Sequence, residues 1–227
     1  ITLTLGSATF ISVFNVRASL SSTVEDMIKW FNCDVMLIFD RTYRGDRVEF
    51  DALNVPGVIQ TDVWIQLSTR LVRSDDSEGG MIYMCAPTVH AESLIVSPTI
   101  AEGRWLMPGD DNAVVVPSAF LQNEPELHLG GDMVLKLDGK EHTFKIVGTY
   151  VGMAFLPLVY TNYDYVTLVT NRVGEADALM VKMERHDPAY VDAATRALED
   201  HFERMGVRVS MVSTINNERT EAEASFD

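Results

Sequence analysis

The sequence has 227 residues, and 47% of them are hydrophobic, which is enough apolar surface for one large folded domain or two small ones. Its formal net charge of −15 argues against a nucleic-acid partner, because neutralising phosphates requires a surplus of Lys and Arg on some surface. The two cysteines, Cys33 and Cys85, are too few for a disulfide scaffold and wrongly spaced for a zinc knuckle. The sequence leaves open whether they pair.

Residues 1–31 begin with a stretch that carries no charged residue before Arg17. At 1.5 Å per residue this stretch spans roughly 24 Å, short of the roughly 30 Å of a bilayer's hydrocarbon core. Further along, apolar residues keep a helical spacing, with charged residues on the other side. We therefore expect residues 1–31 to form a helical stalk that continues a first transmembrane helix. The alternative is an ordinary amphipathic helix packed on the domain.

The next segments predict alternating strands and turns. Residues 34–40 are typical of a buried strand, and a short turn or helix is expected at residues 50–54. Two long strand-like runs, residues 59–72 and 81–89, flank the hydrophilic tip at residues 73–80. This arrangement predicts a β-hairpin whose tip is solvated.

The middle of the chain has closely spaced prolines and glycines among short apolar runs, which predicts a compact β-rich insert at residues 85–160. Its clearest local element is the Asp138-Gly139 pair between two alternating runs. These two residues favour the positive-φ positions of a type I′ hairpin turn.

The chain then returns to regular structure, with a short helix expected near residues 162–170 and a strand at residues 178–184. Asp187 is placed to cap a helix that Gly206 closes, and residues 207–212 form the next strand. A strand, a helix and a strand in so short a span can form a parallel pair. We also expect residues 207–212 to contact residues 34–40.

Residues 213–227 are polar, acidic and compatible with a helix. Paired with the first stalk, they predict a second stalk that leads to a second transmembrane helix. An exposed acidic tail is the alternative.

Together these elements predict an α+β fold class: a two-lobed extracytoplasmic domain flanked by helical stalks. A discontinuous α/β lobe is expected from residues 32–84 and 161–212. The β-rich lobe, residues 85–160, is inserted into it.

The order of these pieces resembles the extracytoplasmic domain of MacB/FtsX-like ABC transporter permeases. The resemblance covers essentially the whole chain and is carried by LTLGSATFISVFNVRASLSSTVEDM, the NVPGV turn, EGRWLMPGDDNAVVVPSAF and LGGDMVLKLDGKEHTFKIVGTYVG. The resemblance implies a porter-like α/β lobe with the β-rich insert, and a location on the extracytoplasmic face of the bacterial cytoplasmic membrane.

The resemblance also implies a set of partners. These are a second permease subunit, in a homodimer or a heterodimer, and a cytoplasmic ATP-binding subunit reached through the membrane part. A peptide, lipid or protein substrate is expected, and the resemblance does not specify which.

Catalytic, cofactor and metal motifs are missing from the sequence. No two of the five histidines have the spacing of a compact metal site, and the sequence around Ser7 lacks the second glycine of a nucleophile elbow. Acidic clusters such as Asp110-Asp111 lack the ligand pattern of a calcium loop. We therefore expect no enzyme activity, no cofactor and no metal.

One apolar loop is the candidate surface for contact with a substrate or partner. Gly152 and Pro157 punctuate it, and its large apolar side chains are Met153, Phe155, Leu156 and Leu158. Exposed apolar loops mark interaction sites. The alternative is that the loop fills the core beneath the insert.

The resulting hypothesis is the outer domain of a transporter permease that binds a substrate or partner and relays movement of membrane helices, that is, mechanotransmission. The alternative hypothesis is the ligand-binding ectodomain of a membrane-anchored sensor without an ATPase partner. Several hydrophobic spans after residue 227 would favour the permease, and a single span would favour the sensor.

Overall fold

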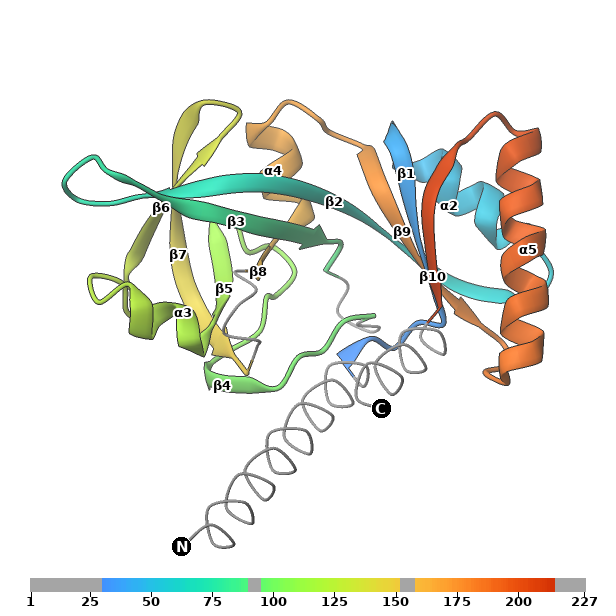
Figure 1. Ribbon diagram of the computed structural model, residues 1–227, viewed down its shortest axis with the longest axis horizontal. Coiled ribbons are helices and arrows are strands. Elements are labelled where there is room, and N and C mark those ends of the chain that lie inside the picture. The colour runs from blue at the N-terminus through green and yellow to red at the C-terminus, as the bar shows by residue number, and fades with distance from the viewer. Residues whose placement is uncertain (1–29, 90–94, 152–157, 215–227) are drawn as a thin grey trace, which may run out of the picture.

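The computed structural model describes residues 30–89, 95–151 and 158–214 (Figure 1). The predicted stalks therefore lie almost wholly outside the described residues. At the C-terminal side, the last described strand runs to Thr214, two residues into the range expected for the second stalk. Among the residues that the structure describes, no helix is long and apolar enough to cross a membrane.

The described residues form one mixed sheet with helices on its flanks (Figure 1). The strands are β1 (Val35–Arg44), β2 (Val58–Val72), β3 (Glu78–Pro87), β4 (Ile100–Gly103), β5 (Ala113–Pro117), β6 (Asp132–Leu137), β7 (Lys140–Tyr150), β8 (Leu158–Thr161), β9 (Glu175–Met183) and β10 (Val209–Thr214). The helices are α2 (Gly45–Leu53), α3 (Ser118–Asn123), α4 (Tyr163–Val169) and α5 (Pro188–Arg204).

The sheet contains ten strands in the order β10-β1-β9-β2-β3-β8-β5-β7-β4, and β6 pairs with both β2 and β7. These pairings close a ring of six strands, β2-β3-β8-β5-β7-β6, which we call the barrel lobe. The other part, which we call the α/β lobe, consists of β10, β1, β9 and the first half of β2, with α2 and α5 packed against them (Figure 1).

The predicted fold class, α+β with two lobes, is confirmed by this arrangement. The residue boundaries proposed for the lobes, 32–84 with 161–212 and 85–160, stay a prediction.

Strand β2 belongs to both lobes. Its first half pairs with β9, ending at Trp64 opposite Ala178. Its last residues, from Arg70 to Val72, pair with β6 and so close the barrel. Strand β3 pairs with β2 from Trp64 onward, so the predicted hairpin of residues 59–72 and 81–89 is confirmed.

The pairing of the last strand differs from the sequence expectation. β9, α5 and β10 follow one another, but β1 lies between β9 and β10 and is antiparallel to both. The two strands thus run in the same direction without pairing, because an earlier segment of the chain occupies the position between them. The expected contact between residues 34–40 and 207–212 is present, with Leu37 opposite Val212.

Local turn and cap predictions are confirmed. Asp138 and Gly139 have φ values of 47° and 80°, as a type I′ turn requires. The Asp187 side chain accepts a hydrogen bond from the Tyr190 backbone N–H at the start of α5. Gly206, with φ of 75°, follows the end of that helix.

Two apolar clusters occupy the two faces of the sheet. The first lies beneath α2 and α5 and continues into the barrel interior, with Leu37, Phe202 and Phe144 among its members. The second lies on the opposite face and is rich in aromatic residues, including Trp64 and Tyr160. Burial of each side chain of this size contributes about 1.5–3 kcal/mol to the free energy of unfolding. Both clusters therefore stabilise the sheet.

Gly148 in β7 lies where the barrel backbone is tightly packed. A Cβ atom built there would lie 2.0 Å from the Arg104 carbonyl oxygen, a backbone atom that cannot turn away. We expect Gly148→Ala to lower the free energy of unfolding by about 2 kcal/mol or more, as overpacking does. Urea denaturation measures the change. Gly80→Ala is the matched control, because its Cβ would meet nothing within 4 Å; an equal effect of both substitutions would contradict the close approach.

Candidate contact site

The predicted contact loop lies mostly outside the described residues. This is true of Met153, Phe155 and Leu156, whereas Leu158 begins β8. Leu158 is opposite Tyr83 of β3 in a parallel pair, and it packs against the aromatic cluster. The structure therefore places one of the four predicted residues.

Leu158 lines a groove with a volume of about 480 Å³. The other lining residues come from β2, which both lobes share, and from β3 of the barrel lobe: Gln66, Leu67 and Ser68 from β2, and Tyr83, Met84 and Cys85 from β3. We call this the contact groove. The sequence predicted the two strands but not the contribution of their residues to this site, because that depends on where β8 joins β3.

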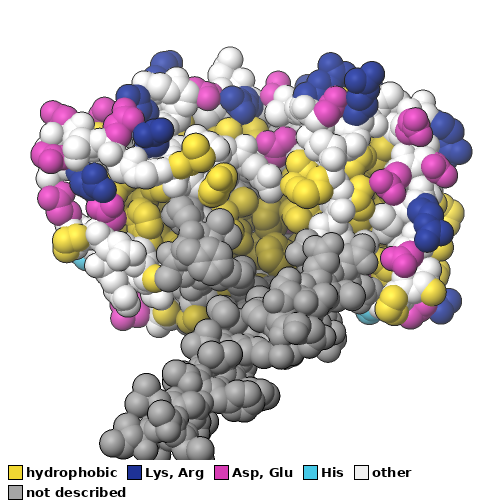
Figure 2. All heavy atoms as spheres, in the orientation of Figure 1, with side chains coloured by type: hydrophobic (Ala, Val, Ile, Leu, Met, Phe, Trp, Pro, Cys, Tyr) yellow, Lys and Arg dark blue, Asp and Glu magenta, His cyan; other side chains and the backbone are white. Residues whose placement is uncertain are grey.

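Large apolar side chains near the contact groove are open to solvent. On β3, Tyr83 is 47% exposed and Met81 is 49% exposed, and residues two apart in a strand share one face. Apolar side chains are visible over the β2–β3 region (Figure 2). Exposed apolar patches of this kind mark interaction sites. The groove can thus hold an apolar group against Tyr83 and Leu158, which lie opposite each other.

Buried aromatic residues fix the position of Leu158. The Tyr150 hydroxyl donates a hydrogen bond of 2.8 Å to the Leu158 carbonyl oxygen. Burial raises the pKa of Tyr150, so its hydroxyl stays protonated and remains a donor. The Tyr150 ring packs edge-on against Tyr160 and Trp30, which holds it in place.

A half-buried carboxylate, that of Asp177, lies beside the groove. The Gln66 backbone N–H donates to both oxygens of Asp177, at 2.9 and 3.1 Å. Burial raises the pKa of Asp177 to about 6. No sequence pattern predicts this contact, since Asp177 is a single polar residue near the start of a strand.

Both cysteines are free thiols in the structure. Burial raises the pKa of Cys85 to about 12, and the negative charge of Asp177 adds to this shift. Burial likewise raises the pKa of Cys33 to about 12. Neither side chain has the thiolate character that a reactive cysteine needs.

Asp62 is a more deeply buried carboxyl group than Asp177, and the sequence did not single it out. It is 4% exposed and accepts hydrogen bonds from Trp64 Nε1, at 3.1 Å, and from the Thr88 hydroxyl. Burial raises its pKa to about 7. A perturbed carboxyl group can indicate a catalytic site, but Asp62 does not line the contact groove.

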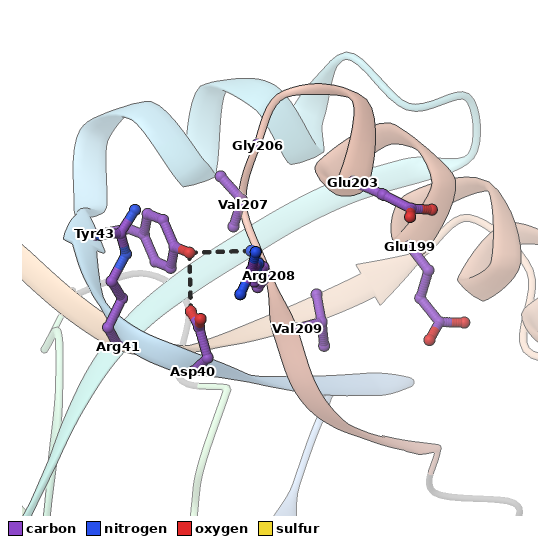
Figure 3. A pocket seen from close by; sticks show the side chains of 9 residues that line it. All are labelled: Asp40, Arg41, Tyr43, Glu199, Glu203, Gly206, Val207, Arg208 and Val209. Atoms are coloured by element: carbon purple, nitrogen blue, oxygen red, sulfur yellow. Dashed lines mark hydrogen bonds between the residues drawn. The ribbon is translucent and has the colours of Figure 1, made fainter.

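A second cavity, of about 890 Å³, lies where β1 ends and α5 leads into β10 (Figure 3). At its centre, the Tyr43 hydroxyl donates to Asp40 Oδ1 at 2.8 Å and accepts from the Arg208 backbone N–H at 3.0 Å. Glu199 and Glu203 line the opposite side. Charges of both signs line this cavity, so it favours no single class of ligand.

Metal-ligating side chains do not gather in the described part of the chain, where no group of three or more His, Cys, Asp or Glu residues could hold an ion. Of the histidines, His186 contacts Asp34 through Nδ1 at 2.7 Å. This contact belongs to the loop between β9 and α5.

No known family model matches the sequence, and no curated protein matches it. The fold is similar to that of the periplasmic region of MacB from Actinobacillus actinomycetemcomitans, with a TM-score of 0.59 and 12% identity. That match covers 86% of this chain and 95% of the MacB chain. The extracellular domain of the noncanonic ABC-type transporter YknZ from Gram-positive bacteria matches with a TM-score of 0.54 and 13% identity, over 81% of this chain and 99% of that one.

These similarities confirm the fold that the sequence resemblance implied. At identities of 12% and 13%, the likeness is one of fold.

The raised pKa of Asp62 leads to a prediction about pH. Its folded-state pKa of about 7 exceeds the unfolded value of about 3.9, so the folded protein binds the proton more tightly. The stability that this proton contributes is present at low pH and is lost as the pH rises through 7. We expect Asp62→Asn, which stays neutral, to gain roughly 2 kcal/mol or more in unfolding free energy relative to the parent between pH 4 and pH 8.

Urea denaturation across this pH range measures the difference between the two proteins. Asp132→Asn is the matched control, because Asp132 is exposed and forms a surface ion pair with Lys145. A difference between parent and Asp62→Asn that does not change with pH would show that Asp62 is ionised throughout.

Proposed function

We propose that this chain is the extracytoplasmic domain of an ABC transporter permease subunit on the bacterial cytoplasmic membrane. It performs no covalent chemistry, and it binds a substrate or partner protein and relays ATP-driven movement of the membrane helices. The fold likeness to MacB and YknZ supports this proposal, as does the order of motifs along the sequence. The partners would be a second permease subunit, identical or different, and a cytoplasmic ATP-binding subunit.

The observation that carries the proposal is the position of the two ends of the described core. Val35 at the start of β1 lies opposite Thr214 at the end of β10. The segments that precede and follow the core therefore join it at neighbouring points. A movement of either segment acts on the same pair of hydrogen-bonded strands.

The segment just before β1 is bonded to the loop that leads into β4. Phe31 forms a β-bridge with Val96. The Asn32 backbone N–H donates to the Ile95 carbonyl oxygen at 2.7 Å, and the Ser97 N–H donates to the Trp30 carbonyl oxygen at 2.8 Å. This segment is thus joined to the chain that enters the barrel lobe.

The same segment is bonded to the α/β lobe through Asp34. Its Oδ2 accepts from the Met183 backbone N–H at 2.7 Å, and its Oδ1 lies 2.7 Å from His186 Nδ1. The Asp34 N–H donates to the Val181 carbonyl oxygen at 2.9 Å. A displacement of residues 30–34 would therefore reach both lobes, as a relay requires.

The contact groove supplies the place for a substrate or partner. Met153, Phe155, Leu156 and Leu158 are the proposed contact residues, and the position of Leu158 in the groove supports this assignment. The lining is apolar apart from Gln66 and Ser68. We therefore propose that the groove receives an apolar part of a peptide, lipid or protein.

The contact role is tested by Phe155→Asp with Leu156→Asp in the full-length transporter. At an interface, each apolar side chain contributes roughly 1–2 kcal/mol through burial, so we expect transport or substrate capture to fall about tenfold or more. The melting temperature and the basal ATP hydrolysis of the partner subunit should stay nearly unchanged.

Leu168→Asp is the matched control, because Leu168 is 67% exposed on α4, away from the contact groove. A sharp fall in melting temperature in the double variant would show that the loop fills the core. Unchanged transport with unchanged stability would overturn the contact role.

The relay is tested by Asp34→Ala in the same transporter. This substitution removes the acceptor for Met183 and the contact with His186, so part of the link between residues 30–34 and the α/β lobe is lost. We expect the amount of substrate moved per ATP hydrolysed to fall severalfold, while basal ATP hydrolysis persists. Asp40→Ala, in the middle of β1, should leave this ratio unchanged; an equal fall in both variants would contradict the relay.

A further inference from the structure

The pairing between β2 and β9 ends beside the contact groove. It runs from Val58 to Trp64 on β2, with Trp64 opposite Ala178. Two residues further along β2, the Gln66 N–H has no carbonyl partner on β9 and donates instead to the two carboxylate oxygens of Asp177. A side chain thus takes the place of the main chain at the end of this ladder.

The pairing on the other side of β9 is irregular at the same residue. Ile38 of β1 lies opposite Ala178, and the next pair joins Tyr43 to Ala176. The intervening β1 residues turn toward β10, where the Asp40 N–H donates to the Arg208 carbonyl oxygen. Asp177 therefore lies at an irregularity in the pairing with both neighbouring strands.

Strands β2 and β3 continue past this point without a break. Their pairing is regular from Trp64 opposite Pro87 to Arg70 opposite Met81. Between the end of the β9 pairing and the start of the β6 pairing, β2 pairs with β3 on one edge, and β3 pairs in turn with β8 from Tyr83 to Cys85. On its other edge β2 has no partner among the described strands over this stretch, and the Asp177 carboxylate bonds to Gln66 there. The lobes can turn about this part of β2, because β2 is the strand that they share.

Asp177 is also in contact with the walls of the contact groove. Gln66 lines the groove and lies opposite Cys85, another lining residue. The Asp177 carboxylate accepts hydrogen bonds from the backbone N–H of Gln66, so it is bonded to one wall of the groove. A change at Asp177 would therefore alter the shape of the groove as well as the angle between the lobes.

We propose that Asp177 is a latch that fixes the barrel lobe relative to the α/β lobe, and that release of its bond to Gln66 lets the lobes turn and reshapes the contact groove. Asp177 acts as a positioning residue, because it lies beside the groove and holds β2 through a backbone N–H. The hydrogen bonds between Gln66 and Asp177 support the role of Asp177 in fixing the lobes. Its role in controlling the contact groove rests on the proposed function.

The test measures the distance between the lobes in the full chain. Cysteines are introduced by Ala197→Cys on α5 and Lys140→Cys at the start of β7, both exposed positions, and are spin-labelled for pulsed electron–electron double resonance. The raised pKa of the natural thiols, about 12 for both Cys33 and Cys85, keeps them from reacting with the label. Labelling of the protein without the added cysteines checks this.

We expect a narrow distance distribution in the parent and one at least twice as wide in Asp177→Ala. Asp177→Asn keeps one carbonyl acceptor but loses the charge, so its distribution should be intermediate. Asp132→Ala, which removes an exposed carboxylate of the barrel lobe, should match the parent.

A folded Asp177→Ala variant with the parent's distribution would overturn the latch. If that variant does not fold, the test uses the Asp177→Asn variant instead. A distance distribution in Asp177→Asn that is as narrow as the parent's then overturns the proposal. A residue with a merely structural role would lower the melting temperature without widening the distances in the folded protein. Because no transport is measured, failure of the latch is distinct from failure of the permease function.

Discussion

The structure depends on one strand, β2, which has to satisfy two sets of neighbours. Its first half completes the α/β lobe against β9, and its last residues close the barrel against β6. Side chains alternate across a strand, so Val63 and Ile65 enter the cluster beneath the helices while Trp64 enters the aromatic cluster on the other face. A shift of register by one residue would reverse these positions, which fixes β2 relative to both lobes.

This constraint explains where the polar groups of the interior lie. Asp62 is buried and Asp177 is half-buried, both close to the point at which β2 leaves β9, and each accepts hydrogen bonds from β2 or its neighbours. A buried carboxyl group is tolerated only where donors satisfy it, and here the donors are an indole N–H, a hydroxyl and a backbone N–H that lacks a strand partner. Burial raises the pKa of both groups, to about 7 for Asp62 and about 6 for Asp177. The junction between the lobes thus combines interrupted pairing with groups that titrate near neutral pH.

The proposed mechanical role follows from the same geometry. The two ends of the core meet where Val35 faces Thr214, and residues 30–34 are bonded both to the loop that leads into the barrel lobe and to the α/β lobe. The contact groove lies on β2, which both lobes share, and on β3 and β8 beside it, so a movement applied at the ends can alter it. Such a role needs well-packed elements and an apolar surface rather than a reactive side chain.

The local elements and the general class of the fold could be predicted from the amino-acid sequence. The Asp138-Gly139 turn and the Asp187 cap follow from φ preferences and side-chain bonds that act within a few residues, so they could be predicted without the rest of the chain. Of the candidate contact site, the apolar loop with Leu158 was predicted, whereas Tyr83, Leu67 and the other lining residues of β2 and β3 were not. Three features became apparent only from the folded chain: β1 lies between β9 and β10, β6 closes the barrel on β2, and Asp177 replaces a backbone partner of Gln66. The physical reason is that strand partners are selected by burial and register between segments far apart in the chain, which a local pattern does not encode.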